Sequence, residues 1–302
     1  MIAESEAGPH RSFWELAAAS ARLYPQFIDQ LQDDSGVHID FRREGTIRFT
    51  DPAEVLMVGR SLSKEDLLRL EPSLEFEAPA VFLEEGSVDP RLLLEALLKS
   101  AKHLGVDVLS GAEVTEIEAN QRGAVAAVTT KARYHGTVIV NCAGAWADAF
   151  SPLPVPTKPI KGQMLALIPE HRGVITHVIR GNGVYLIPRG DGRIVVGATV
   201  EDVGFDKRVN PEAIQQMHQA AAVLVPQLGQ ARIHEDWAGL RPCTPDKLPV
   251  IGKTALDGYF VATGHYRDGI MLAPITALLM SRLIRGVDVE FDLSAFSPSR
   301  FC

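Results

Sequence analysis

The chain has 302 residues, about twice the usual length of one domain, which favours either two domains or one large α/β unit. Hydrophobic residues make up 46% and charged residues 23%, a composition that excludes a disordered chain, a collagen and a coiled coil. The net charge is −8 and no basic tract occurs, so we expect no nucleic-acid partner. The three cysteines show no C-x-x-C spacing, which argues against a disulfide framework and favours a reducing, cytoplasmic environment.

The hydropathy pattern argues against a membrane protein. The first residues lack the basic and apolar regions of a signal peptide. The most apolar late stretch, 269–284, contains Pro274 and Arg282 and is too short to cross a bilayer. We therefore expect a soluble protein with no membrane span. Its oligomeric state stays open, a homo-oligomer included.

The first hundred residues predict mainly helices. Apolar residues recur at three- and four-residue steps over 12–31, which is typical of an amphipathic helix. Ser63 opens a short helix that should end before Pro72, because the residue before a proline disfavours helical dihedral angles. A stronger helix is predicted over 89–104, with Asp89 as its N-cap.

Strands are expected to follow that helix. Residues 106–109 predict a strand, and with it the start of helix-to-strand packing of the doubly wound kind. Two hairpin strands are predicted over 113–119 and 124–130. The apolar run 137–142 predicts a strand that is covered on both faces, and the small residues after it would let a ligand approach closely.

Four prolines over 152–159 predict a crossover into a second, strand-rich region. The elements expected there and beyond are strands over 163–168, 183–188 and 193–198, a helix over 211–224, a strand over 259–263, and a last helix that ends at Arg285. The pattern as a whole predicts an α/β fold.

The turn before the last helix is a candidate binding site. His265, Tyr266, Arg267 and Asp268 are crowded between two glycines there. Free N–H groups and the positive end of the dipole at a helix start favour an anion. A simple strand-to-helix connection explains the same pattern, so both interpretations stay open at this point.

Arg241 and Tyr185 are further candidates. Arg241 ends a short apolar run and precedes Pro242, an arrangement suited to bidentate binding of a carboxylate. Tyr185 alternates with core-like residues, so its hydroxyl can face a cleft. A surface arginine and a structural tyrosine are the plain alternatives. The histidines lack zinc-site spacing and no serine lies in a G-x-S-x-G context, so we expect neither a metal site nor an esterase.

Six ordered segments of the sequence carry a resemblance to a known family. They are Cys142-Ala143-Gly144-Ala145-Trp146, Lys161-Gly162-Gln163-Met164, Gly197-Ala198-Thr199, Trp237-Ala238-Gly239-Leu240-Arg241-Pro242, Pro249-Val250-Ile251-Gly252 and Gly264-His265-Tyr266-Arg267-Asp268-Gly269-Ile270. Together they resemble the D-amino-acid oxidase superfamily of FAD-dependent flavoproteins, and within it the bacterial glycine oxidase branch of thiamine biosynthesis. The resemblance covers nearly the whole chain.

The resemblance implies a fold of two interleaved domains. An FAD-binding, Rossmann-like domain would comprise 1–37, 83–152 and 241–302, and a strand-rich α+β substrate-binding domain would comprise 38–82 and 153–240. The family's G-x-G-x-x-G turn, which holds the ADP half of FAD, does not occur in this sequence. We therefore expect an amino-truncated chain in which FAD binding is weakened.

The resemblance also implies roles for single residues. Arg241 matches the arginine that binds the substrate carboxylate, Tyr185 the tyrosine that shares it, and Arg267 a second arginine close to flavin and substrate. The residues expected to contact FAD, mostly through their backbone, are Met1, Val114, Ala143, Gly144, Gly264, His265, Tyr266, Arg267, Asp268, Gly269, Ile270 and Met271.

The implied reaction is the oxidation of glycine or another small amine or amino acid. Hydride passes from the substrate to FAD, the imine product hydrolyses, and oxygen reoxidises the flavin to give hydrogen peroxide. A sarcosine-type oxidase or an amino-acid dehydrogenase is the alternative enzyme. A flavin-free, inactive remnant is the alternative of another class.

Overall fold

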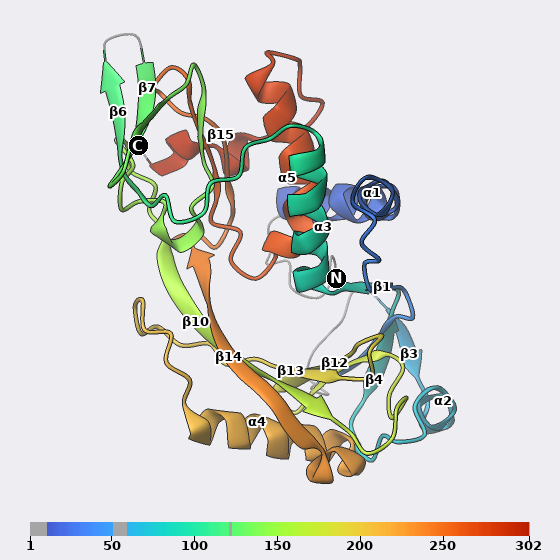
Figure 1. The fold of residues 1–302 in the computed structure, drawn as a ribbon. Helices are drawn as coiled ribbons and strands as arrows, with labels where there is room; N and C mark the ends of the chain where they lie inside the picture. The colour runs from blue at the N-terminus through green and yellow to red at the C-terminus, as the bar shows by residue number, and fades with distance from the viewer. Residues whose placement is uncertain (1–10, 51–58, 121–122, 302) are drawn as a thin grey trace.

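The computed structural model describes residues 11–50, 59–120 and 123–301. Over these ranges an eight-stranded sheet and two helices form one half of the molecule, and three helices gather with smaller sheets in the other half (Figure 1). The helices are α1 (Arg11–Ser35), α2 (Lys64–Leu70), α3 (Pro90–His103), α4 (Pro211–Leu224) and α5 (Gly269–Ile284). This architecture confirms the predicted α/β fold class.

The predicted helices all occur, and their ends have local causes. The Ser63 side chain caps α2 by accepting a hydrogen bond from the Asp66 N–H, and Asp66 reciprocates in a capping box. The Asp89 side chain caps α3, with Pro90 at the first helical position. Asn210 caps α4 in the same way. Local chemistry therefore determines where these helices begin.

The eight-stranded sheet has two faces with different compositions. In spatial order its strands are β14 (Arg232–Cys243), β10 (Lys158–Ile168), β13 (Ile194–Gly197), β12 (Val184–Pro188), β11 (Val178–Gly181), β2 (Thr46–Phe49), β4 (Ala80–Leu83) and β3 (Arg60–Leu62). Residues directly opposite each other on neighbouring strands share a face, so each register row lies wholly on one side.

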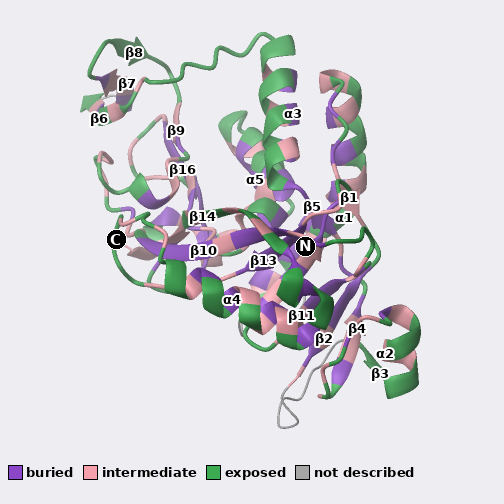
Figure 2. Ribbon diagram, turned by 60° about the horizontal axis from the view of Figure 1, so that its bottom comes forward, coloured by how far each residue is buried: buried purple, intermediate pink, exposed green. Residues whose placement is uncertain are grey.

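One row of the sheet is entirely apolar. It crosses five strands and consists of Ile47, Ile179, Leu186, Val196 and Leu165, each with 0% exposure. This side, the core face, packs against the apolar residues of α4 (Figure 2). The core face is thus the hydrophobic centre of this half of the molecule.

The neighbouring row lies on the opposite side of the sheet, the cavity face. It consists of Arg48, Arg180, Tyr185, Gly197 and Met164. Two arginines, a tyrosine and a glycine are a poor choice for a packed core, and this face borders a cavity instead. Strand alternation therefore places polar groups and core residues on opposite sides of the same strands.

The other half of the molecule contains two three-stranded sheets. One has the order β15 (Val250–Lys253), β16 (Tyr259–Thr263), β9 (Ile139–Asn141), in which β16 and β9 are parallel. The other has the order β6 (Val114–Asn120), β7 (Gly123–Thr129), β8 (Arg133–His135). A short pair, β1 (Phe41–Arg42) and β5 (Ser87–Val88), leads from the large sheet into α3.

The strand predicted over 106–109 is wrong. These residues pair with no described strand, and Val106, Val108 and Leu109 are each more than half exposed. Hydrophobicity alone suggested a strand, but a strand also needs a hydrogen-bonding neighbour. In this half of the molecule the doubly wound packing expected to begin there is accordingly reduced, within the described ranges, to the parallel pair of β9 and β16.

α1 supports the beginning of α5. Pro274 has no N–H, so it cannot donate the helical hydrogen bond to the Ile270 carbonyl four residues earlier. The Tyr24 hydroxyl donates to that carbonyl instead, and the Ser20 hydroxyl donates to the Met271 carbonyl at 2.6 Å. Burial raises the pKa of Tyr24, which keeps this donor protonated.

No helix in the described part of the chain is both long enough and apolar enough to cross a membrane. The boundaries of the two interleaved domains stay a prediction.

Candidate active site

A cavity of about 550 Å³ opens on the cavity face of the large sheet. Its wall includes Tyr185, Arg241, Arg267 and Ile270, which come from β12, β14, the turn before α5 and α5 itself. The three side chains predicted to act on substrate, those of Tyr185, Arg241 and Arg267, thus line one cavity. Ile270, a further residue predicted to contact FAD, lines it too. Met1 lies outside the described residues.

Arg241 is held in place by the backbone. Its Nη1 donates to the Thr199 carbonyl at 3.0 Å and to the Lys161 carbonyl at 3.3 Å. The guanidinium lies over Gly162, where an added Cβ would come within 2.2 Å of it. Only glycine leaves room at this position, so strand β10 is shaped to receive the arginine of β14.

Tyr185 lies over a second glycine. A Cβ on Gly197 would come within 2.5 Å of the Tyr185 hydroxyl oxygen. The hydroxyl contacts the Met164 sulfur at 3.7 Å, and Met164 is directly opposite Gly197 on the next strand. Gly162 and Gly197 therefore form the floor beneath the two predicted carboxylate ligands.

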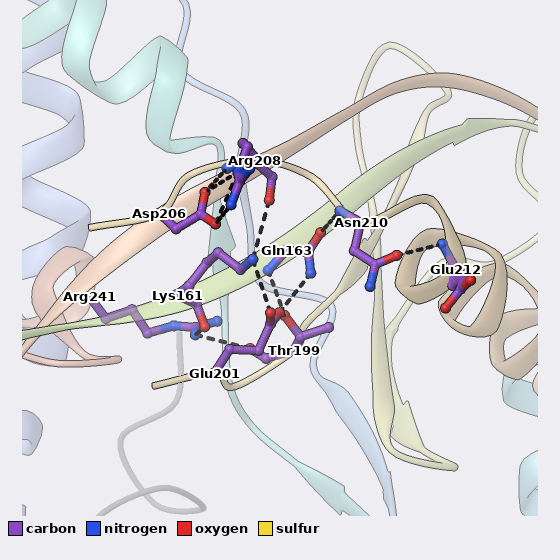
Figure 3. A network of polar contacts seen from close by, with 9 residues as sticks. All are labelled: Lys161, Gln163, Thr199, Glu201, Asp206, Arg208, Asn210, Glu212 and Arg241. Carbon is purple, nitrogen blue, oxygen red and sulfur yellow. Dashed lines mark hydrogen bonds and ion pairs between the residues drawn. The ribbon is translucent and has the colours of Figure 1, made fainter. Parts of the chain in front are cut away.

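A buried polar network fixes the backbone that holds Arg241 (Figure 3). Glu201 pairs with Lys161 at 3.0 Å and accepts a hydrogen bond from the Gln163 side chain at 2.7 Å and another from the Thr199 hydroxyl. Burial alone would raise the pKa of Glu201, but hydrogen bonds from Thr199, Gln163 and Lys161 outweigh burial and hold that pKa below its usual value. Glu201 is therefore an anion that ties the Thr199 segment to β10.

The turn before α5 is joined to the end of β14. The Tyr266 N–H donates to the Pro242 carbonyl at 2.9 Å, and Cys243 and His265 form an isolated β-bridge. The Arg267 guanidinium lies 5.5 Å from the centre of the Tyr266 ring. Because Pro242 directly follows Arg241, this connection joins the turn that carries Arg267 to the strand end that carries Arg241.

His265 points away from the cavity. Its Nε2 lies 3.0 Å from the Thr276 hydroxyl of α5, and His265 is not among the cavity-lining residues. Desolvation by burial lowers its pKa to about 4, so the ring is neutral at physiological pH. The predicted contact of His265 with FAD, through its backbone, stays a prediction.

The other predicted FAD contacts fall into two groups. Ala143 and Gly144 follow β9, and the Thr263 hydroxyl at the end of β16 donates to the Gly144 carbonyl at 3.0 Å. The carboxyl ends of these two parallel strands therefore meet, as a nucleotide-type site requires. Val114 lies away from the cavity, where it packs with Ala143 against a separate apolar cluster.

The start of α5 fits the ring system of a flavin. The first N–H groups of a helix lack partners within it, and the N-cap Asp268 makes no capping hydrogen bond with its side chain. Ile270 and Arg267 both line the cavity there, whereas Met271 is buried in the core beneath α5. A helix N-terminus beside an arginine suits a group that gains negative charge when reduced.

Sequence analysis missed several residues of this cavity. Arg48, Arg180, Arg189 and Gly197 line it, and Gly162 lies beneath the Arg241 guanidinium. One available signal was the Asn-Gly pair at 182–183, which is typical of a two-residue hairpin turn. Both residues have positive φ, and the hairpin puts position 180 opposite 185.

Comparisons with known proteins agree with this geometry. Residues 1–283 match the family described as FAD dependent oxidoreductase. The glycine oxidase of Geobacillus kaustophilus is 31% identical over 319 residues, which cover 99% of this chain and 84% of that protein. The crystal structure of the glycine oxidase from that organism superposes with a TM-score of 0.91 at 29% identity, covering 98% of this chain and 85% of that one.

Two further relatives have other names. The bifunctional protein ThiO/ThiG of Synechocystis sp. is 35% identical over 95% of this chain, which spans only 45% of that protein's length. The hydrogen cyanide synthase subunit HcnC of Pseudomonas aeruginosa is 31% identical over 99% of this chain and 78% of its own length. The chain therefore belongs to the family of FAD-dependent oxidoreductases, enzymes whose cofactor is FAD.

Proposed function

We propose that this protein is an oxidase of glycine or another small amino acid or amine. The observation that carries the proposal is the fixed Arg241 guanidinium in a cavity shared with Tyr185 and Arg267. An arginine oriented by backbone carbonyls presents its remaining N–H groups to a carboxylate without reorganisation. The glycine oxidases among the relatives support a small substrate.

Each side chain then has a defined task. Arg241 and Tyr185 bind the substrate carboxylate and so orient the α-carbon. Arg267 and the N-terminus of α5 stabilise negative charge beside them. FAD, when bound, supplies the two-electron acceptor for the α-hydrogen and its electrons.

The cavity needs no general base if the amine arrives neutral. Among the described residues that line it there is no aspartate, glutamate or histidine. We propose oxygen as the final electron acceptor, with hydrogen peroxide as its product. An amino-acid dehydrogenase would share the carboxylate site and differ only in the acceptor that reoxidises the flavin.

Turnover and flavin reduction test the proposal separately. The flavin-loaded protein should produce peroxide with glycine and with N-methylglycine, and faster than with bulky D-amino acids. Anaerobic bleaching of the flavin by glycine without peroxide production in air would identify a dehydrogenase. Strong peroxide production with a bulky D-amino acid and none with glycine would contradict the assignment to small substrates.

A further inference from the structure

We propose that the cavity takes amino acids that carry a second carboxylate, and that Arg180 binds this second group. The inference rests on the function proposed above, because it extends the site in which Arg241 and Tyr185 hold the first carboxylate. The substrate class would be small dicarboxylic amino acids, with the two carboxylates separated by a few carbon atoms.

The first argument is the number of arginines in one cavity. The wall contains Arg48, Arg180, Arg189, Arg241 and Arg267. A single carboxylate held by Arg241 and a flavin beside Arg267 account for two of them. The other three add positive charge to the same wall, and planar guanidinium groups are well suited to a further carboxylate.

The second argument is the position of Arg180 on the sheet. Arg180 is directly opposite Tyr185 across the β11–β12 ladder, and Arg48 is directly opposite Arg180 across the β11–β2 ladder. Directly opposite residues have Cβ atoms about 4.5–5.5 Å apart on the same face. The Cβ atom of Arg180 therefore lies beside that of Tyr185, the residue that we propose shares the first carboxylate.

The spacing between the two arginines suits a short dicarboxylate. The Arg241 guanidinium lies over Gly162 of β10, and β10 and β11 are separated by β13 and β12. Three strand spacings are about 14 Å at the backbone. Both arginines line the cavity, and a backbone span of this size leaves room between them for a small molecule with a charge at each end.

The third argument is a buried arginine whose donors are not all used. Arg189 is only 8% exposed, and its Nε and Nη1 have no hydrogen-bond partner among the described residues. The nearest carboxylate oxygen, on Asp89, is 3.9 Å from Nε. Buried donors are normally satisfied, so an anion or ordered water in the cavity is expected to complete this group. Arg189 thus raises the positive potential at the same wall.

Binding of non-reactive ligands tests the inference without turnover. Succinate and its monoamide, succinamate, have nearly the same shape and differ by one charge. In calorimetric titrations of the flavin-loaded protein, in which FAD already occupies its own site, succinate should bind about tenfold or more tightly than succinamate. Arg180→Gln should abolish that difference, and Arg180→Lys should retain part of it.

Arg133→Gln is the matched control. It removes the same charge from the exposed end of the β6–β7–β8 sheet, where Arg133 pairs with Glu118. This control should keep the wild-type preference for succinate. Equal affinity of the wild type for both ligands would overturn the inference, as would an equal loss of both ligands in Arg180→Gln.

Turnover separates this inference from the proposed function. The ratio of kcat/KM for D-aspartate over D-asparagine should fall about tenfold or more in Arg180→Gln and stay at the wild-type value in Arg133→Gln. An unchanged ratio in an enzyme that oxidises glycine would overturn only the role of Arg180. Oxidation of none of these amino acids by the flavin-loaded protein would overturn the proposed function itself.

Discussion

The two faces of the eight-stranded sheet use the same strands for different purposes. Leu186 and Tyr185 are neighbours in β12, yet Leu186 has 0% exposure against α4 and Tyr185 lines the cavity. On the core face the side chains fill space, whereas on the cavity face glycines leave space for Arg241 and Tyr185. This difference indicates that stability and substrate binding can be changed separately by substitutions one residue apart.

Loss of Arg241 should have the largest effect on the cavity face. Arg241→Ala removes the side chain that we propose binds the substrate carboxylate, and we expect transition-state stabilisation to fall by about 2–5 kcal/mol, measured from kcat/KM. Arg241→Lys should recover only part of this loss, because an ammonium group cannot reproduce the two-pronged contact.

The control for Arg241 is a substrate without a carboxylate. A neutral amine of similar size should be oxidised almost equally by the wild type and by Arg241→Ala. If kcat/KM fell by the same factor for amines with and without a carboxylate, Arg241 would be a structural residue of β14. The free energy of unfolding, measured in parallel with urea, should change little.

Loss of Leu186, on the core face, should lower the free energy of unfolding, in contrast to loss of Arg241, which should lower kcat/KM. Leu186→Ala opens a cavity between the sheet and α4, and we expect the free energy of unfolding to fall by about 3 kcal/mol. Tyr185→Phe, one residue earlier, should lower it by about 1 kcal/mol or less while it raises KM for amino acids. A large stability loss in Tyr185→Phe would show that the two faces are not independent.

Gly162→Ala should displace Arg241 without removing it. The new Cβ would lie 2.2 Å from the guanidinium, so the arginine must leave its place over β10. A displacement of about 1 Å at a substrate-positioning group lowers kcat/KM about 100-fold. The expected loss is therefore confined to substrates that carry a carboxylate.

Gly239→Ala is the matched control for this substitution. Gly239 is directly opposite Gly162 on β14, and a Cβ there meets no atom within 4 Å. It should leave the kinetics near the wild-type values. Equal losses in the two alanine variants would mean that the β10–β14 backbone, rather than the space for Arg241, is sensitive to the change.

The helix starts and the cavity differed in how well they could be predicted from the sequence. Capping residues such as Ser63 and Asp89 set the starts of helices, and these depend only on a few neighbouring residues. Arg241 and Tyr185 were candidates from their local sequence, and the resemblance then supplied their expected roles. Their shared cavity requires the pairing of β10, β13 and β12, which are distant contacts that no local pattern encodes.

Two misses have the same physical cause. Arg180 was overlooked because its importance depends on the strand across the hairpin, although the Asn-Gly turn gave its register. Residues 106–109 were predicted as a strand on apolar character alone, and they pair with no described strand. In both cases the outcome depends on whether and where another strand pairs with the segment, which the segment's own residues do not determine.

The turn before α5 offers a further test, a pH dependence of stability. Desolvation lowers the pKa of His265 from 6.5 to about 4 in the folded protein, so between these values the unfolded chain binds more protons than the folded one. Stability from this group is therefore complete above about pH 6.5 and decreases as the pH falls toward 4.

His265→Gln should remove this component, so that the free energy of unfolding of the variant falls less steeply than that of the wild type below pH 6.5. Urea titrations at several pH values compare the two slopes, and other titrating groups cancel because both proteins share them. Above pH 7 the difference between the proteins should be constant, and parallel curves over the whole range would show that His265 is not desolvated in this turn.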